Sequence, residues 1–389
     1  MSLSFSFRAP TQIMMSDDCA RTLSDVLESE RPPHVAIVVD RNVMAVPAVD
    51  ASLAACRKIA DRVTVLPVDS REPDTDFVDE QAAPLRNDRP DLLVGIGGGS
   101  VLDLAKALGV LAWNTGTAAD YQGRNLVPRP GCTIVMMPTT AGTGSEVTPG
   151  AVVVNPATKR KGAISSPYMV PRYAILDPAL SASMPPGVAA STGMDALAHA
   201  VESFAARCAT PMTRMYSREA FRLISRSLPA LLRDAGSGAH RADQQLGATL
   251  AGIAICNSDT GACHAMAYPL GIYAAVPHGT AVGLLLPEVM ARNIAKGARA
   301  YAALADLLPT AAPGDSDEIK SRKLHAFVSQ VVPAGMFGRS LADFGVRRSD
   351  VPFLAERGLD LKTALASNPV DFAADDARWV LERLVADTR

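Results

Sequence analysis

Three histidines and one aspartate, grouped in two short segments, are the residues of this sequence best suited to chemistry. Asp195 and His199 are four residues apart, so on a helix both side chains leave the same face. His264 and His278 lie in a second segment and could complete the same site from other elements. One carboxylate and three imidazoles form a ligand set that suits zinc or ferrous iron. The pattern therefore indicates a catalytic metal centre, and with it an enzyme.

Each of these residues also has a simpler interpretation. A single buried histidine is more often a hydrogen-bonded core residue than a ligand, and Asp195 could instead cap a helix. Glu202, seven residues after Asp195, would share its helix face and could either orient a ligand imidazole or form a surface salt bridge. The metal interpretation depends on the four residues taken together.

Two glycine- and hydroxyl-rich segments follow predicted strands. In the first, Gly98, Gly99 and Ser100 precede a helical pattern, where glycines let the backbone approach a phosphate and the helix N-terminus offers free N–H groups. In the second, at 138–148, Thr139, Thr140 and other hydroxyls could bind adenine, ribose or phosphate. The simpler alternative for each is an ordinary turn. Two such loops at strand ends in one sheet favour a nucleotide site.

Asp40 ends the first predicted strand. An acid at this place can accept a hydrogen bond from the adenosine ribose 2′-hydroxyl and repel a 2′-phosphate, which favours NAD over NADP. The alternative is a residue that only forms the turn after the strand.

Composition sets the broad class. The chain has 389 residues, which favours two domains. Its net charge of −2 leaves no basic excess to neutralise phosphates, so nucleic acid is not expected as a partner. The six cysteines show no CxxC spacing, no secretory leader is evident, and no run of about 18 apolar residues occurs. We therefore expect a cytoplasmic protein with reduced thiols and no membrane span.

Two patterns divide the chain. The first part alternates apolar strands with helices, which predicts a mostly parallel sheet covered on both faces. The predicted strands are residues 34–40, 62–67, 91–97, 132–138, 151–155 and 173–177, with helices at 48–61 and 100–111. Beyond about residue 183, helical periodicity dominates. The predicted helices there are residues 187–206, 211–234, 241–256, 280–294, 296–307, 319–331, 339–345 and 373–387. The domain boundaries are thus 1–182 for an α/β domain and 183–389 for an all-helical domain.

Taken together, these segments resemble the iron-containing (type III) alcohol dehydrogenase family. The resemblance spans most of the chain, with the motifs in the right order. The matching segments are Phe-Arg-Ala-Pro-Thr-Gln-Ile at 7–13, GGGSVLDLAKA at 97–107, PTTAGTGSEVT at 138–148, AILDPAL at 174–180, GMDALAHAVES at 193–203, and CHAMAYPLG with PHGTAVGLLLP within 263–287.

This resemblance implies a dinucleotide-binding α/β domain and a helical metal-binding domain, the fold shared with dehydroquinate synthase. It implies interconversion of a small alcohol with its aldehyde or ketone, using NAD(H) or NADP(H) and iron or zinc, in a homodimer. The implied metal ligands are Asp195, His199, His264 and His278. The implied nucleotide contacts are Asp40, Gly98, Gly99, Ser100, Thr139, Thr140 and Lys161.

The sequence departs from the family pattern at three positions. Tyr268 stands where the family commonly has a histidine near the substrate, and it could donate a hydrogen bond or relay a proton. Gly150 replaces a larger residue near the nicotinamide, and Glu72 stands in the region of an asparagine that often contacts the nucleotide.

Two other functions remain open at this stage. A sugar-phosphate cyclase of the dehydroquinate synthase type would need a cluster of basic residues near the metal to bind phosphate. Residues 261–291, which contain two of the candidate ligands, include no Arg or Lys, and this argues against a cyclase. A non-catalytic nucleotide-binding relative would not need the intact set of metal ligands.

Overall fold

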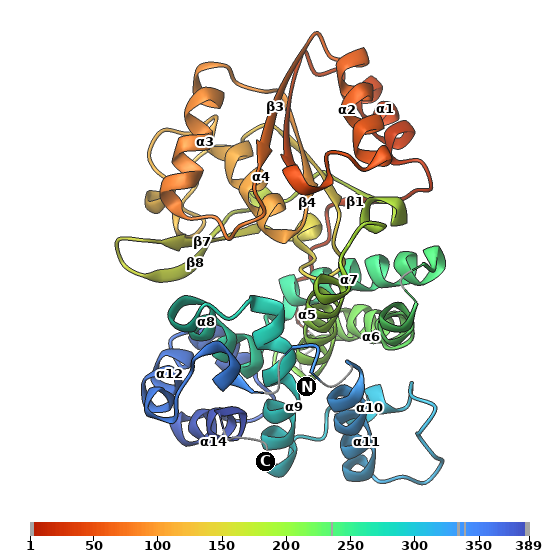
Figure 1. Ribbon diagram of the computed structural model, residues 1–389, viewed down its shortest axis with the longest axis vertical. Helices are drawn as coiled ribbons and strands as arrows, with labels where there is room; N and C mark the ends of the chain where they lie inside the picture. The colour runs from red at the N-terminus through yellow and green to blue at the C-terminus, as the bar shows by residue number, and fades with distance from the viewer. Residues whose placement is uncertain (1–3, 235, 333–334, 338–339, 386–389) are drawn as a thin grey trace. The chain divides into compact units, whose positions relative to one another are not determined.

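The computed structural model describes residues 4–234, 236–332, 335–337 and 340–385. The chain forms two compact units, which we call the α/β unit, residues Ala9–Met184, and the helical unit, Met1–Arg8 with Pro185–Arg389 (Figure 1). The short N-terminal segment belongs to the helical unit through two contacts. The Phe7 ring stacks on Tyr216 with centroids 5.4 Å apart, and the Arg8 backbone N–H donates to Asn257 Oδ1 at 2.8 Å. Which ligand each unit binds stays a prediction.

A six-stranded sheet in which all pairings are parallel forms the centre of the α/β unit, and the prediction of a mostly parallel sheet is confirmed. Its strand order is β1-β9-β6-β4-β2-β3. The strands are β1 (Gln12–Met15), β2 (His34–Asp40), β3 (Arg62–Val68), β4 (Leu92–Gly97), β6 (Thr133–Pro138) and β9 (Tyr173–Leu176).

Two details of the predicted sheet are wrong. The strand at 34–40 is the second of the sheet, because the short edge strand β1 precedes it in sequence. The strand predicted at 151–155 does not join the large sheet. It is β7 (Gly150–Asn155), which pairs antiparallel with β8 (Arg160–Ser165), and β5 (Gly123–Arg124) completes this small sheet. The hairpin forms because the turn at 156–159 is too short for a crossover helix.

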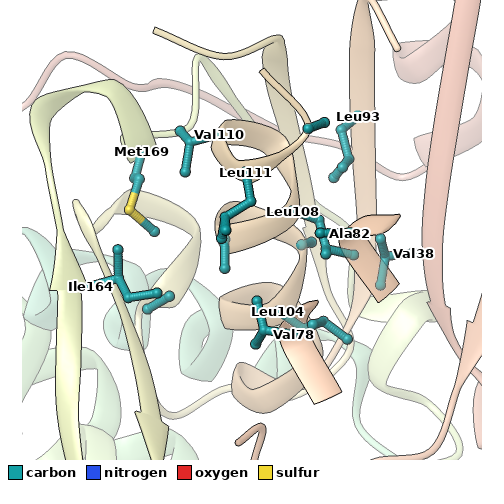
Figure 2. Close-up of a cluster of buried hydrophobic side chains, with 14 of the residues drawn as sticks. Val38, Val78, Ala82, Leu93, Leu104, Leu108, Val110, Leu111, Ile164 and Met169 are labelled. Atoms are coloured by element: carbon teal, nitrogen blue, oxygen red, sulfur yellow. The ribbon is translucent and has the colours of Figure 1, made fainter. Parts of the chain in front are cut away.

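Helices cover both faces of the large sheet. One face packs on α1 (Cys19–Glu30) and α2 (Pro47–Ile59), and the other on α3 (Thr75–Asn87) and α4 (Gly99–Leu111). Because α4 is buried on nearly all sides, it is apolar around its circumference. Figure 2 shows α4 side chains in the core that lies between the large sheet and the small one. The labelled residues are Val38, Val78, Ala82, Leu93, Leu104, Leu108, Val110, Leu111, Ile164 and Met169.

The helical unit contains the metal-ligand candidates. Its helices are α5 (Pro186–Ala205), α6 (Pro211–Arg233), α7 (Gly238–Ser258), α8 (Ala262–Ala274), α9 (His278–Ala295), α10 (Ala302–Ala305), α11 (Asp317–Gln330), α12 (Val351–Gly358), α13 (Lys362–Ser367) and α14 (Ala374–Val385). None of the helices in the described ranges has the length and apolarity that crossing a membrane requires.

The predicted helices of this unit differ from the structure in several places. The sequence did not predict α8, α12 or α13. The helix predicted at 296–307 is reduced to the four residues of α10, because Gly297 adopts a φ of +95° and ends α9. Within the helix predicted at 339–345, Leu341–Phe344 form a single 3₁₀ turn, and residue 339 lies outside the described residues. Residues 386 and 387 of the last predicted helix lie outside them as well.

Candidate functional site

Three helices of the helical unit carry the four candidate metal ligands. Asp195 and His199 lie on α5, and both are buried. His264 lies in the first turn of α8, and it is also buried. His278 is the first residue of α9, and its side chain keeps 32% of its surface exposed. The i,i+4 spacing on α5 therefore places one carboxylate and one imidazole on the same helix face, as the sequence predicts.

The imidazole nitrogens of all three histidines converge on one oxygen atom, Oδ1 of Asp195. The Nε2 atom lies 3.3 Å from this oxygen in His264, 3.5 Å in His278 and 3.8 Å in His199. For metal–ligand bonds of about 2.1 Å, donor atoms at the corners of a tetrahedron lie about 3.4 Å apart. Each of the three nitrogens thus lies at about this spacing from Asp195 Oδ1.

The rings themselves are arranged around the carboxylate. The His199 and His264 rings stack with centroids 4.5 Å apart and planes within 15°, and the His278 ring is tilted by 55° from that of His264 at 5.6 Å. The ligand atoms of Asp195, His199 and His264 all lie within 4.8 Å of one another. Asp195, His199 and His264 therefore form the compact part of the cluster, and His278 lies beside them.

Close helix packing makes this convergence possible. A Cβ atom at Gly279 would collide with the backbone carbonyl of Ser191, so only glycine lets the start of α9 approach α5 this closely. This contact brings the neighbouring His278 to the face of α5 that carries Asp195.

Glu202 supports His264 from the far side of its ring. Its Oε2 atom lies 2.5 Å from Nδ1 of His264, and its Oε1 atom accepts a hydrogen bond from the Cys263 backbone N–H at 2.8 Å. Glu202 is buried on α5, so the alternative of a surface salt bridge is wrong. Its carboxylate fixes both the ring orientation and the start of α8.

Mutual electrostatics hold these groups ionised. Burial opposes the charge on Asp195, but the imidazoles around it, first of all His199, hold the pKa of its carboxyl well below the usual range. Burial likewise disfavours a charged His264, yet the carboxylates of Glu202 and Asp195 raise the pKa of this ring to about 10. Two buried carboxylates thus stabilise positive charge on the imidazoles, and a bound divalent cation would take the place of that charge.

Tyr268 lies one helical turn after His264 on α8. Its ring meets the His278 ring edge-on, with centroids 6.1 Å apart. The tyrosine that replaces the expected histidine is therefore next to the metal-ligand cluster.

Six of the seven predicted nucleotide residues, all except Lys161, lie at or just beyond the carboxyl-terminal edge of the large sheet in the α/β unit. Asp40, Gly98 and Thr139 each stand at or directly after the carboxyl end of one of the neighbouring parallel strands β2, β4 and β6. In open α/β sheets this is the edge at which ligands bind. The pairing of Gly97 with Pro138 brings the two glycine-rich loops side by side.

The two loops also pack against each other. Gly98 is the N-cap residue of α4, and Gly99 and Ser100 form its first turn. A Cβ atom at Gly98 would lie 3.3 Å from Cγ2 of Thr140, and one at Gly99 would lie 2.8 Å from the hydroxyl oxygen of Thr143. The two glycines thus let the second loop pack closely against the start of α4, and no side chain caps the N–H groups of this helix.

Of the two roles considered for Asp40, the structure shows the one in the turn. Its Oδ1 atom accepts hydrogen bonds from the backbone N–H of Asn42 at 2.9 Å and from Nδ2 of Asn42 at 3.0 Å, so the carboxylate does form the turn after β2. Asn42 in turn lines a mostly apolar cavity of about 540 Å³ between residues 42–48 and 179–183.

Lys161 lies in the small sheet, in β8, where it pairs with Val154 of β7. Its ammonium group forms an ion pair with Glu72, the residue in the region where the family commonly has an asparagine. The lysine side chain is 6% exposed, so its charge is largely committed to this carboxylate.

Asp103 and Lys106 were not predicted as site residues. Both lie on α4, after the loop at 98–100, and they bond to residues 145–152, which form the end of the second loop and the start of β7. A signal was present in the sequence, because these are the only two charged residues of an otherwise apolar helix.

Comparisons with known proteins agree with this arrangement. A family model described as iron-containing alcohol dehydrogenase matches residues 10–178, and one described as Fe-containing alcohol dehydrogenase family, C-terminal, matches residues 189–385. Long-chain-alcohol dehydrogenase 1 of Geobacillus thermodenitrificans is 33% identical over 363 residues, which covers 91% of this chain and 90% of the relative. The 1,3-propanediol dehydrogenase of Klebsiella pneumoniae is 34% identical over 335 residues, or 86% of each chain.

The fold is also that of solved members. The crystal structure of a 1,3-propanediol oxidoreductase superposes with a TM-score of 0.91 at 30% identity, covering 98% of this chain and all of the other. These matches favour the oxidoreductase over a cyclase. The chain belongs to the iron-containing alcohol dehydrogenase family, and its reaction is the NAD(P)(H)-linked interconversion of an alcohol with its aldehyde or ketone.

Proposed function

We propose that Asp195, His199, His264 and His278 bind one catalytic divalent ion, ferrous iron or zinc. The observation that carries this proposal is the convergence of three imidazole nitrogens on Oδ1 of Asp195, at 3.3–3.8 Å. Nitrogen and carboxylate donors in this number suit both metals. His278 is the most exposed of the four residues, so we expect substrate to reach the ion from the side of His278.

When bound, the ion supplies Lewis-acid polarisation of the substrate oxygen, and the nicotinamide supplies or accepts the hydride. The chain's own groups prepare the site for this chemistry. Asp195 brings a full negative charge, because its carboxyl stays ionised throughout the neutral range. Glu202 accepts the Nδ1 proton of His264 and so directs Nε2 of that ring toward Asp195.

We assign the proton transfer to Tyr268. Its ring lies edge-on to His278, which places it beside the cluster. A phenol can donate a proton when the substrate oxygen gains charge and accept it in the reverse reaction.

The nucleotide contacts proposed are Asp40, Gly98, Gly99, Ser100, Thr139, Thr140 and Lys161. The N-terminus of α4, which no side chain caps, suits the pyrophosphate. Asp40 beside the apolar cavity suits an adenosine with a free 2′-hydroxyl. We therefore propose NAD(H) as the preferred form over NADP(H).

A small alcohol and its aldehyde are the proposed substrates, as the names of the propanediol dehydrogenase relatives suggest. A homodimeric assembly and a cytoplasmic location stay predictions from the sequence.

The test uses protein that is purified anaerobically and loaded with Fe²⁺ or Zn²⁺. A panel of small aldehydes is added, and the reaction is followed by the absorbance of NADH. We expect NADH to be consumed in equal amount with the aldehyde. The His264→Ala variant should lose its metal and its turnover but still bind NADH. Full turnover in that variant would contradict the metal proposal, and conversion of substrate without net change in NADH would indicate a cyclase.

A further inference from the structure

Lys106 is the largest completely buried side chain of the described residues, yet it carries a charge. Its Nζ atom donates to the carbonyl oxygen of Ser145 at 3.0 Å and to the hydroxyl of Thr148 at 3.0 Å. It also donates to the carbonyl of Gly150 and forms an ion pair with Asp103 at 3.1 Å. A buried ammonium group is costly unless its donors are satisfied, and these four partners satisfy them.

Asp103 binds the same segment from the preceding turn of α4. Its Oδ1 atom accepts a hydrogen bond from the Ser145 hydroxyl at 2.6 Å, and its Oδ2 atom accepts one from the Val152 backbone N–H at 2.8 Å. Together the two charged side chains hold residues 145–152 along α4.

These contacts continue a line that starts at the helix N-terminus. There Gly98 faces Thr140 and Gly99 faces Thr143, while Asp103 and Lys106 hold the residues that follow. The second glycine-rich loop therefore runs beside α4 over two turns of the helix. Contacts at Gly98 and Gly99 set the distance between the second loop and the loop at 98–100 at one end. The buried Asp103–Lys106 ion pair sets this distance at the other end.

Neither side chain can itself serve as a surface for the nucleotide. Lys106 is 0% exposed, and all the partners described above belong to the α/β unit. An apolar residue of the same length would fill the space without the cost of burying a charge. The charge therefore has another use, which is to fix the backbone of residues 145–150 through their carbonyl groups.

We propose that Lys106, with Asp103, is a positioning residue for the dinucleotide. It fixes the spacing between the loop at 98–100 and the loop at 139–148, so that both contact the same cofactor. This inference rests on the proposed nucleotide site.

The test measures the binding and turnover of NADH in three variants of the metal-loaded enzyme. Lys106→Met removes the charge, and Thr148→Val removes one acceptor with little change in shape. Thr158→Val, in the exposed turn between β7 and β8, is the matched control. The readouts are the Kd for NADH from fluorescence, KM and kcat, the metal content per chain, and Tm.

We expect Kd and KM for NADH to rise about fivefold to tenfold in Thr148→Val and more than tenfold in Lys106→Met. The kcat at saturating NADH and the metal content should stay within about twofold of wild type, and Thr158→Val should match wild type throughout. Should Lys106→Met fail to fold, Thr148→Val decides alone.

Two results would overturn the inference, and they differ from each other. A lower Tm in Lys106→Met or Thr148→Val, with unchanged Kd and KM for NADH, would show that the ion pair serves only stability. No NADH binding by the wild-type enzyme would instead overturn the proposed nucleotide site itself.

Discussion

Oε2 of Glu202 and Nδ1 of His264 lie 2.5 Å apart, and both residues are buried. The carboxylate accepts a hydrogen bond from the ring on this side, so the opposite nitrogen, Nε2, faces Asp195 and is the atom that a metal ion would bind. Because Glu202 also accepts the Cys263 N–H at 2.8 Å, the same group fixes the ring and the start of the helix that carries it. One carboxylate on α5 thereby sets the position of a ligand on α8.

Replacing Glu202 with Gln should weaken metal binding by about 10- to 100-fold, the usual effect of losing a hydrogen-bond partner behind a ligand histidine. Gln keeps the volume but loses the charge that stabilises the Nδ1 proton. The measurement is a competition titration with a chromogenic chelator. Glu219→Gln, in an exposed ion pair with Arg222 on α6, is the control. An unchanged titration midpoint in Glu202→Gln would refute the role.

Replacing Asp40 with Asn should shift the cofactor preference toward NADPH by about tenfold. This variant keeps an oxygen that accepts a hydrogen bond from Asn42 but removes the negative charge. A carboxylate and a 2′-phosphate 4 Å apart near a protein surface repel each other by up to ~4 kcal/mol, and the variant removes this repulsion. The ratio of kcat/KM for NADH to that for NADPH reports the change. Asp69→Ala, at an exposed acid after the adjacent strand, should leave the ratio as it is. A preference equally unmoved in Asp40→Asn would show that Asp40 only forms the turn.

Tyr268→Phe should lower kcat by about 100-fold while metal content stays at the wild-type value. The loss follows from the removal of a positioned proton donor. Steady-state kinetics across pH, with metal analysis of the same samples, provide the measurement. Tyr273→Phe is the control, because Tyr273 lies on the same helix but is exposed and packs on Phe353. If kcat in Tyr268→Phe equals that of wild type, the proton passes through another group.

Asp376→Asn should destabilise the helical unit at neutral pH by about 1–3 kcal/mol, since Asp376 is 2% exposed and bonds to Arg292 at 2.7 Å and Lys296 at 2.6 Å. Burial alone would raise the pKa of this carboxyl, but its bonds to Lys296, Ala373 and Arg292 lower it.

The sign of the pH effect follows from that lowered pKa. The stabilisation by Asp376 is complete above the unfolded value of about 3.9 and is lost as pH falls through the lower folded pKa. The difference in Tm between Asp376→Asn and wild type should therefore be constant from pH 7 to pH 5 and shrink below about pH 4. Asp375→Asn, at the exposed neighbour, is the control and should show little difference at any pH. A difference that grows toward low pH would contradict the assignment.

The large sheet could be predicted from the sequence because its central strands are continuous apolar runs followed by glycines or acids. β2 and β9 match their predicted ranges to within one residue. The edge strand β1 was missed, since four residues with mixed exposure leave no such run. β7 has the same apolar signal as the sheet strands, so the sequence could not show that it pairs with β8 instead.

The metal site was predictable only in part from spacing. The i,i+4 pair on α5 follows from helix geometry, but the approach of His264 and His278 depends on how three helices pack. α8 was missed because it is buried on most sides and contains Pro269, so it shows no polar face and no regular period. Glu202 was correctly placed on the helix face of Asp195, but only the packing of α8 against α5 reveals its partner.

The four donor atoms all come from residues 195–278, whereas every proposed nucleotide contact lies between Asp40 and Lys161. A chain emerging from the ribosome therefore completes its nucleotide-binding surface before the last imidazole has been translated. The proposed ion could therefore be bound only after His278 has been synthesised, and it would then link α5, α8 and α9.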